Sequence, residues 1–327
     1  MEAQYTYMVC TRCTTFNHYA YIEDTMNGFC MQKTDFPFVC IITDDASTDG
    51  EQDVIKKYFE SNFSLLETEE TNDYVLNFGQ HKINGNCYFA VLYLRYNHFS
   101  IKKDKAPYFT CWENKSKYIA LCEGDDYWTD ENKLQKQVDF LENHKEYSMV
   151  FHGADILSEN NMRTPFKCFE IEDREYSPDE VFKNWIVPTA SILANRAVLD
   201  VKNDYTFKPM NGDIIVILNC AKIGKIRGMS DRMSVYRVHP TGVTYDKRLK
   251  REWALRHPEH IKFIRSNYSF LSKRIVRQKL SMAYLGMVRY AGNIFTMFEY
   301  FFKAELCFPG IVTSRIVKKI IAFRKNK

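Results

Sequence analysis

The chain of 327 residues is 45% hydrophobic and 15% aromatic, a composition that excludes a disordered protein and suffices for one or two domains. Its formal net charge is only +4, but residues 247–327 hold 19 Lys and Arg against 4 Asp and Glu, so residues 1–246 are acidic. Such an asymmetry predicts two parts with different roles. We expect one domain over residues 1–246 and a basic helical region over residues 247–327.

Ten cysteines are present, yet their spacing predicts no disulfide framework. Cys10 and Cys13 have Cys-x-x-Cys spacing, but no second pair follows to complete a zinc site. We therefore expect reduced thiols and a cytoplasmic protein. Residues 1–30 lack the apolar segment of a secretory signal, and no run of about 18 apolar residues predicts a transmembrane helix.

The N-terminal part alternates strand and helix patterns. Strands are predicted over residues 5–14 and 38–43, and each is followed by a helical pattern. Thr48 or Asp49 could cap the second helix. The inward residues of the two helices are Ile22, Met26 and Phe29, then Val54, Ile55, Tyr58 and Phe59. The alternation favours a parallel sheet with right-handed crossovers.

Further along, residues 86–99 predict an amphipathic helix, because four aromatic or apolar residues recur at helical spacing. More strands are predicted over residues 118–122, 148–151 and 233–238, and helices from Thr129 and over residues 214–221. The polar, proline-containing segment 158–180 predicts an irregular excursion.

After residue 247 the pattern is helical and basic. Phe295, Phe298, Phe301, Phe302 and Leu306 lie close to helical spacing, and residues 311–323 mix Ile and Val with Lys and Arg. A basic amphipathic helix of this kind could lie on anionic lipid. The alternative is a packing helix with a solvated basic face.

Two acidic clusters follow apolar strands: Asp44-Asp45-Ala46-Ser47-Thr48-Asp49, and Glu123-Gly124-Asp125-Asp126. The carboxyl ends of parallel strands meet in the crevice where open α/β sheets bind ligands. Carboxylates gathered there repel one another unless a cation or a ligand offsets their charge. The clusters therefore indicate a metal-assisted site for a phosphorylated substrate, although each alone could be a turn with capping acids.

These clusters, with three other motifs, resemble glycosyltransferase family 2, whose members have the GT-A fold. Thr15-Phe16-Asn17 resembles the motif that closes the first strand, and residues 44–49 resemble the Asp-Asp-Gly-Ser-Thr-Asp signature, with Ala46 in place of Gly. Residues 123–126 resemble the DxD region, with Glu123 at its first acidic place. Asn211-Gly212-Asp213 and His239-Pro240-Thr241-Gly242 resemble the later acidic motif and the late His segment.

The resemblance covers roughly residues 5–245 and implies an α/β, GT-A-type, mainly parallel (mixed) sheet flanked by helices, with a C-terminal helical extension. It also implies donor-binding roles for Thr15, Asn17, Asp44, Asp45, Glu123 and Asp126. A carboxylate such as Asp44 or Asp45 suits the N3–H group of uracil. Plain turn or capping roles are the alternatives for these residues.

Asp125 and His239 are the implied ligands of a divalent cation, for which Mg²⁺ and Mn²⁺ both fit. Asp213 is the implied general base, and capping of the helix that follows it is the alternative. Trp128, Thr189 and Ser191 are implied on the acceptor side, although Trp128 fits the core equally well.

The implied function is inverting transfer of a sugar from a nucleotide-diphosphate donor, most simply UDP-linked, to a hydroxyl of a glycan or lipid-linked acceptor. Its setting would be bacterial surface polysaccharide biosynthesis, with peripheral contact at the inner face of the membrane through residues 293–327. The acidic body argues against nucleic acid as a partner.

Three alternatives remain. A catalytically inactive GT-A-like scaffold would not need the retained acids. A metal-dependent nucleotidyltransferase would carry a glycine-rich basic loop near the N-terminus, whereas residues 11–17 supply only Arg12 and no glycine. An NAD-dependent dehydrogenase would carry Gly-x-Gly-x-x-Gly after the first strand, which is absent.

Overall fold

The computed structural model describes residues 5–159, 162, 164, 167–205, 207–210, 212–242, 247–311 and 313. The chain divides into two compact units. The first comprises residues 1–177, 185–201 and 219–238, and the second comprises residues 178–184, 202–218 and 239–327. The expected division into one domain over residues 1–246 and a basic helical region over residues 247–327 stays a prediction.

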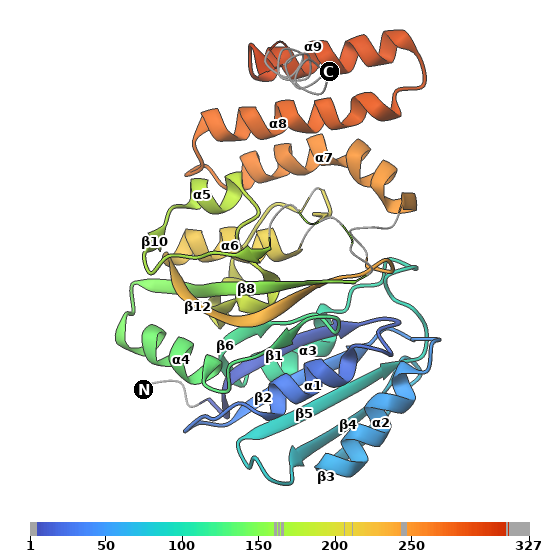
Figure 1. Cartoon of the computed structure of the whole chain (residues 1–327), viewed down its shortest axis with the longest axis vertical. Coiled ribbons are helices and arrows are strands. Elements are labelled where there is room, and N and C mark those ends of the chain that lie inside the picture. The colour runs from blue at the N-terminus through green and yellow to red at the C-terminus, as the bar shows by residue number, and fades with distance from the viewer. Residues whose placement is uncertain are drawn as a thin grey trace. The chain divides into compact units, whose positions relative to one another are not determined.

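A twelve-stranded mixed sheet forms the centre of the first unit (Figure 1). Its strands are β1 (Tyr7–Thr15), β2 (Phe38–Asp44), β3 (Phe63–Glu70), β4 (Tyr74–His81), β5 (Cys87–Leu94), β6 (Ser116–Leu121), β7 (Tyr127–Trp128), β8 (Tyr147–Ser158), β9 (Cys168–Phe169), β10 (Glu175–Tyr176), β11 (Leu193–Asn195) and β12 (Lys225–Val238). The main order is β10-β12-β8-β11-β6-β1-β2-β5-β4-β3, with β7 beside β12 and β9 beside β8.

The four central strands, β6, β1, β2 and β5, run parallel to one another. β2 is buried along its whole length, as expected for an apolar strand covered on both faces. In the register of these strands Thr15 lies opposite Asp44, and Asp44 lies opposite Tyr93. Asp44 therefore lies at the carboxyl ends of the central strands, beside the end of β1.

Helices cover both faces of this sheet. α1 (Ile22–Cys30), α2 (Glu51–Asn62) and α4 (Lys133–Asn143) pack one face through residues such as Phe29, Ile55 and Leu134. α3 (Ala106–Glu113) packs Phe109 and Trp112 against the other face. α1 and α2 lie in front of the central strands in Figure 1. The predicted mainly parallel, mixed sheet flanked by helices is confirmed.

The predicted helix over residues 86–99 is wrong, because residues 87–94 form β5. The sequence Cys-Tyr-Phe-Ala-Val-Leu-Tyr-Leu is nearly all apolar and is buried between β2 and β4. An apolar run of eight residues fits a buried strand and a buried helix equally well, so periodicity alone could not separate them. The helix predicted from Thr129 begins at Lys133 instead.

β3 forms one edge of the sheet and pairs with β4 in a hairpin. Only its first residue, Phe63, is buried, and residues 64–70 are exposed. This segment had no clear sequence pattern, because an edge strand with one partner need not alternate between core and solvent.

The second unit is helical. It contains α5 (Pro178–Lys183), the first turns of α6 (Gly212–Ile223), α7 (Lys247–Asn267), α8 (Lys273–Met287) and α9 (Ile294–Cys307). Its core includes Phe182, Leu218, Ile264, Tyr268 and Val276. The predicted C-terminal helices are thus confirmed. Within the described part of the chain, every helix is too short or too polar to span a bilayer.

Candidate active site

Two loops, one after β1 and one after β2, are joined by hydrogen bonds. The side-chain oxygen of Asn17 accepts from the Thr48 backbone N–H at 2.8 Å, and the Asn17 N–H donates to Ser47 Oγ at 2.9 Å. The Tyr19 N–H donates to Asp49 Oδ2 at 2.9 Å. The two motifs that the sequence singled out therefore form one structure, and its hydrogen bonds fix the rim of the site.

Two residues of these loops have a left-handed backbone. Asn17 has φ 57° and Ala46 has φ 60°. Asn tolerates this region, whereas a Cβ there normally costs about 1–2 kcal/mol. Ala46 occupies the place of the glycine in the resembling signature, and the positive φ explains why a glycine suits that place.

Glu51, which the sequence analysis missed, lies at the centre of the loops. It is fully buried at the first position of α2. Its carboxylate accepts from the Thr15 hydroxyl, from the His18 N–H at 2.9 Å and from the Ser47 hydroxyl at 2.8 Å. Burial raises the pKa of Glu51 to about 7 in spite of these donors. The one available signal was an acid directly after Asp49-Gly50, where a helix starts.

Asp44 is buried beneath the loops. Its Oδ1 accepts from the Ser47 N–H at 3.0 Å and from Gln52 Nε2 at 2.6 Å. Its Oδ2 is buried and has no hydrogen-bond partner among the described residues. Burial raises the pKa of the Asp44 carboxyl.

Asp45 anchors the segment that follows β5. One carboxylate oxygen accepts from the His98 N–H at 2.7 Å, and the other accepts from the Phe99 N–H at 3.1 Å and from Lys105 Nζ at 2.9 Å. Asn97 Nδ2 also donates to the backbone oxygen of Asp45. Because these donors occupy both oxygens, Asp45 acts in this structure as a positioning residue for residues 97–105.

The second acidic cluster approaches the end of β1 through Gly124. A Cβ built on Gly124 would overlap the side chain of Thr15, so only glycine lets these two segments of the backbone come this close. The Thr25 hydroxyl lies 3.0 Å from the Gly124 carbonyl oxygen and 2.7 Å from that of Asp126. The cluster is therefore held against both β1 and α1.

Asp126 is buried and ties the cluster to β12. Its Oδ1 accepts from the Arg237 N–H at 2.9 Å. The Arg237 guanidinium donates to the Asp125 carbonyl oxygen at 2.9 Å and to Asp24 Oδ2 at 2.8 Å. Burial, followed by the neighbouring Asp125 carboxylate, raises the pKa of Asp126 well above its ordinary value. Asp126 thus joins the second acidic cluster to β12 by a buried hydrogen bond.

Asp125 and Glu123 remain accessible. The Asp125 side chain is 21% exposed, and its Oδ2 lies 3.8 Å from Nε2 of His18, which is 15% exposed. Glu123 is exposed. A carboxylate oxygen and an imidazole nitrogen at this separation are donors that suit Mn²⁺ and related divalent cations. The residues therefore fit a cation, with His18 as a ligand that the sequence analysis did not name.

His239 and Asp213 belong to the second unit. His239 directly follows Val238, the last residue of β12, and its Nδ1 lies 2.8 Å from Thr241 Oγ1. Asp213 lies in the first turn of α6, where its Oδ1 accepts from the Ile214 N–H at 2.8 Å. Burial raises the pKa of Asp213. Asn211 lies outside the described residues, and the roles of metal ligand and base stay predictions.

The structure places two of the predicted acceptor-side residues in the core. Trp128 is 1% exposed, packs edge-on against Phe29 and donates its indole N–H to the Ala190 carbonyl oxygen at 2.9 Å. Ser191 is fully buried and donates to the Pro188 carbonyl oxygen at 2.6 Å. Thr189, in the 3-10 turn η2 (Thr189–Ser191), is half-buried. Trp128 and Ser191 therefore present almost no surface to an acceptor in this structure, and the acceptor-side roles stay predictions.

The sequence profile of glycosyl transferase family 2 matches residues 13–92, a region that includes both joined loops and Glu51. This N-terminal part of the chain is therefore similar to glycosyltransferase family 2. The second acidic cluster and the helical unit lie beyond the matched residues.

Two curated proteins are similar to a larger part of the chain. The uncharacterised protein Rv1520 of Mycobacterium tuberculosis is 29% identical over 232 residues, which are 70% of this chain and 58% of the relative. The chain thus spans a little over half the length of that relative. The putative teichuronic acid biosynthesis glycosyltransferase TuaG of Bacillus subtilis is 24% identical over 276 residues, which are 81% of this chain and 95% of TuaG.

Two solved structures share its fold. TarS of S. aureus (residues 1–349, in complex with UDP-GlcNAc) has a TM-score of 0.56 at 14% identity over 91% of this chain and 79% of that chain. The mannosyltransferase PcManGT of Pyrobaculum calidifontis, in complex with GDP-Man and Mn²⁺, has a TM-score of 0.52 at 13% identity over 92% of this chain and 87% of that chain. At these identities the likeness shows the GT-A fold.

Proposed function

We propose that the protein is an inverting glycosyltransferase that moves a sugar from a nucleotide-diphosphate donor to a hydroxyl of a glycan or lipid-linked acceptor. The observation that carries the proposal is the accessible pair His18 and Asp125, held by buried acids after β1 and β6 in a chain whose residues 13–92 match the family 2 profile. A UDP-sugar is the proposed donor, since the TarS structure holds UDP-GlcNAc. Surface polysaccharide synthesis is the proposed setting, in line with the name of TuaG.

In this proposal His18 and Asp125 hold a divalent cation, with His239 as the predicted further ligand. A bound cation would neutralise the diphosphate as it leaves. PcManGT was solved with Mn²⁺, which supports a cation of this type. Glu123 is exposed and would accept hydrogen bonds from the ribose hydroxyls, while Asp126 and Glu51 hold the surrounding loops.

Asp213 is the proposed general base. The acceptor oxygen would form the new bond to the anomeric carbon as the bond to the diphosphate breaks, and the hydroxyl proton would pass to the Asp213 carboxylate. Attack opposite the leaving group inverts the anomeric configuration. The raised pKa of Asp213 favours this role, because a proton acceptor works best when its pKa approaches the working pH.

The donor site is tested by thermal stabilisation with UDP, GDP, CDP, CMP and NAD, each with and without Mn²⁺. We expect a Mn²⁺-dependent rise in melting temperature with UDP, lost in Asp125→Ala and kept in Glu146→Ala, which removes an exposed acid outside the site. Stabilisation by GDP alone would change the donor. No stabilisation by any nucleotide would contradict the transferase and favour the inactive scaffold.

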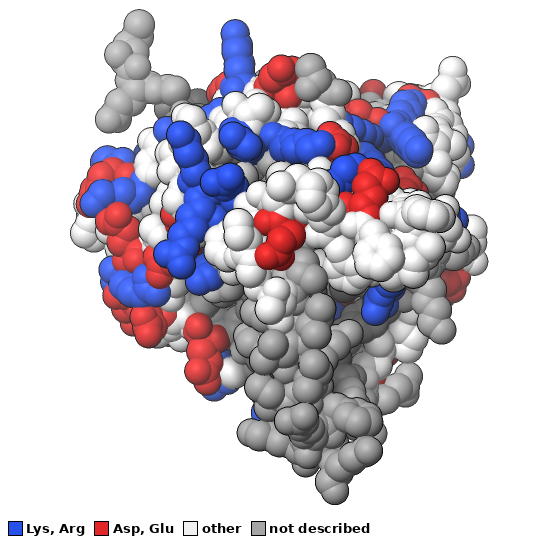
Figure 2. Space-filling model, turned by 90° about the horizontal axis from the view of Figure 1, so that it is seen from above, with Lys and Arg blue, Asp and Glu red and all other residues white. Residues whose placement is uncertain are grey.

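We also propose peripheral contact with anionic membrane through residues 293–327. In α9, Phe295, Phe298 and Phe302 are 82%, 61% and 64% exposed, so a stripe of aromatic rings faces solvent. Figure 2 shows Lys and Arg side chains scattered among uncharged and acidic ones on the face that it presents. The predicted basic helix with Ile316, Ile320 and Phe323 lies outside the described residues.

Flotation with liposomes that contain phosphatidylserine tests this contact at low salt. Deletion of residues 293–327 should reduce binding, and so should replacement of Phe295, Phe298 and Phe302 together by Ser. Because these rings are exposed, the triple variant should keep its melting temperature. Unchanged flotation of both variants would rule out the membrane contact.

A further inference from the structure

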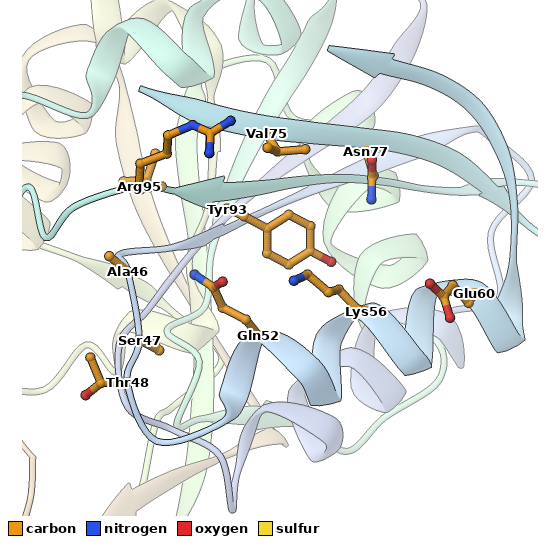
Figure 3. Close-up of a pocket in the computed structure, with 11 residues that line it drawn as sticks. Ala46, Ser47, Thr48, Gln52, Lys56, Glu60, Val75, Asn77, Tyr93 and Arg95 are labelled. Carbon is orange, nitrogen blue, oxygen red and sulfur yellow. The ribbon is translucent and has the colours of Figure 1, made fainter. Parts of the chain in front are cut away.

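A cavity of about 590 Å³ opens in the first unit between α2 and the strands β4 and β5 (Figure 3). One wall is the face of α2 that carries Gln52, Lys56 and Glu60, and the other carries Asn77, Tyr93 and Arg95. His18, Glu123 and Asp125 do not line it. The cavity is therefore distinct from the proposed cation site, and its volume suits a small ligand.

Tyr93 forms the floor of this cavity with an unused hydroxyl. The residue is 5% exposed, and its buried Oη has no hydrogen-bond partner among the described residues. Figure 3 shows the ring over the sheet with its hydroxyl toward the α2 side, where Lys56 lies. A buried hydroxyl without a partner is destabilising, and Phe would pack the same space without that cost. The hydroxyl is therefore best explained by a bound partner.

Positive charge and hydrogen-bond donors dominate the rest of the lining. Lys56 Nζ stands 5.4 Å from the centroid of the Tyr93 ring and makes no ion pair within the described structure. Arg95 donates to Glu70 and to the Thr71 carbonyl oxygen, at the other end of the cavity. The amide group of Asn77 accepts from Thr68 Oγ1 at 3.3 Å, which leaves its N–H groups as donors.

This lining selects a chemical class. An unpaired ammonium beside a phenolic O–H favours an anionic group, and charge-assisted hydrogen bonds are the stronger ones. The Gln52 and Asn77 amides and the Glu60 carboxylate supply alternating donors and acceptors, which suit the hydroxyls of a sugar ring. We infer that this cavity is a second binding site that takes an acidic saccharide, a sugar unit that carries a carboxylate.

The site adjoins the loop after β2. Ser47 and Thr48 line the cavity and also hold Asn17, and Gln52 reaches from the cavity wall to Asp44. An occupant would thus rest on the loop that Glu51 fixes. The inference goes beyond the proposed function and does not depend on it, because binding here involves neither the cation ligands nor Asp213.

The test titrates the full chain with D-glucuronate and D-galacturonate, with D-glucose and inorganic phosphate as comparison probes, and follows binding by protein NMR shifts. At least one of the two uronates should bind about tenfold more tightly than either comparison probe. Glucose binding equally well would overturn the acidic part of the inference, and phosphate binding equally well would overturn the saccharide part. No saturable binding of either uronate would overturn the site.

Variants locate the binding. Lys56→Met and Tyr93→Phe should each weaken uronate binding about five- to tenfold. Lys57→Met, an exposed neighbour on α2 that does not line the cavity, should leave it unchanged. Without ligand, Tyr93→Phe should keep or raise the melting temperature, which separates lost binding from misfolding. Normal uronate binding by both cavity variants would contradict the assignment.

UDP binding with Mn²⁺, measured in the same variants, keeps the two sites apart. If the cavity inference is right, Lys56→Met should retain the nucleotide response of the wild type. If neither the wild type nor any variant responded to the nucleotide while uronate still bound, the result would count against the proposed transferase and leave the cavity assignment unaffected.

Discussion

At the scale of single residues, Ala46 offers the simplest test of the loop geometry. Its φ of 60° lies in the left-handed region, where a Cβ is unfavourable and glycine is not. Ala46→Gly should therefore raise the free energy of unfolding by about 1 kcal/mol in urea denaturation. Ala90→Gly, in the ordinary strand backbone of β5, should lower it. A destabilised Ala46→Gly variant would contradict the argument.

Glu51 makes stability depend on pH. Its pKa rises from 4.5 to about 7 on folding, so the folded protein binds this proton more tightly than the unfolded chain. The resulting contribution is fully present below pH 4.5 and is lost as the pH rises through about 7. The difference in stability between wild type and Glu51→Gln should shift in favour of the variant across this range, by on the order of 3 kcal/mol.

Urea midpoints at pH 4.5, 6 and 8 would measure the Glu51 effect. Glu146→Gln, which changes an exposed acid, serves as the matched control and should follow the wild type at each pH. A constant difference between wild type and Glu51→Gln across the range would show that Glu51 titrates normally.

The sequence predicted which strand ends carry acids, because apolar runs that end in Asp or Glu are visible in one dimension. It could not predict which oxygens are already occupied. Both carboxylate oxygens of Asp45 accept hydrogen bonds from residues 97–105. The Glu51 carboxylate accepts hydrogen bonds from Thr15, His18 and Ser47. Partners separated by 30 or more residues in the chain, such as Asn17 and Ser47, are set by strand register, which no local pattern reveals.

At the scale of elements, the segment 97–105 depends on one carboxylate. Asp45→Asn would remove the ion pair with Lys105 and one strong acceptor for the His98 and Phe99 N–H groups. We expect hydrogen exchange in this segment to become about tenfold faster or more, because a buried charged hydrogen bond contributes about 1.5–3 kcal/mol. Asp104→Asn, an exposed acid of the same segment, should leave the exchange rates of His98 and Phe99 unchanged.

The elements show where sequence patterns are sufficient. α1, α2 and α4 have polar outer faces, so their periodicity was readable, and β2 ends where its acids begin. β5 is buried between β2 and β4. Its hydrogen bonds to these two strands, and not its own sequence pattern, make it a strand and not a helix. β3 and β4 pair as a hairpin, which the polar sequence of β3 does not predict.

At the scale of the molecule, each unit has its own apolar core, so donor binding and proton transfer should be separable by mutation. Asp213→Ala, in the second unit, should keep Mn²⁺-dependent UDP binding and lose transfer by about 10²–10⁴-fold. Calorimetry would measure binding, and UDP release with a panel of glycan and lipid-linked acceptors would measure transfer. Glu259→Ala, an exposed acid of the same unit, is the control, and full turnover by Asp213→Ala would refute the base assignment.

The exposed edge strand β3 has a consequence for how the protein behaves in concentrated solution. Within the described structure β3 pairs with β4 alone, and its other edge, with the exposed Leu65 and Leu66, offers backbone groups on which another copy could add a strand. Glu67 and Glu69 put like charges along that edge, and such repulsion is screened within about 10 Å at 0.1 M salt. Self-association should therefore increase with ionic strength, and light scattering at low and high salt would detect it. Solubility would then depend on two glutamates that take no part in the proposed chemistry.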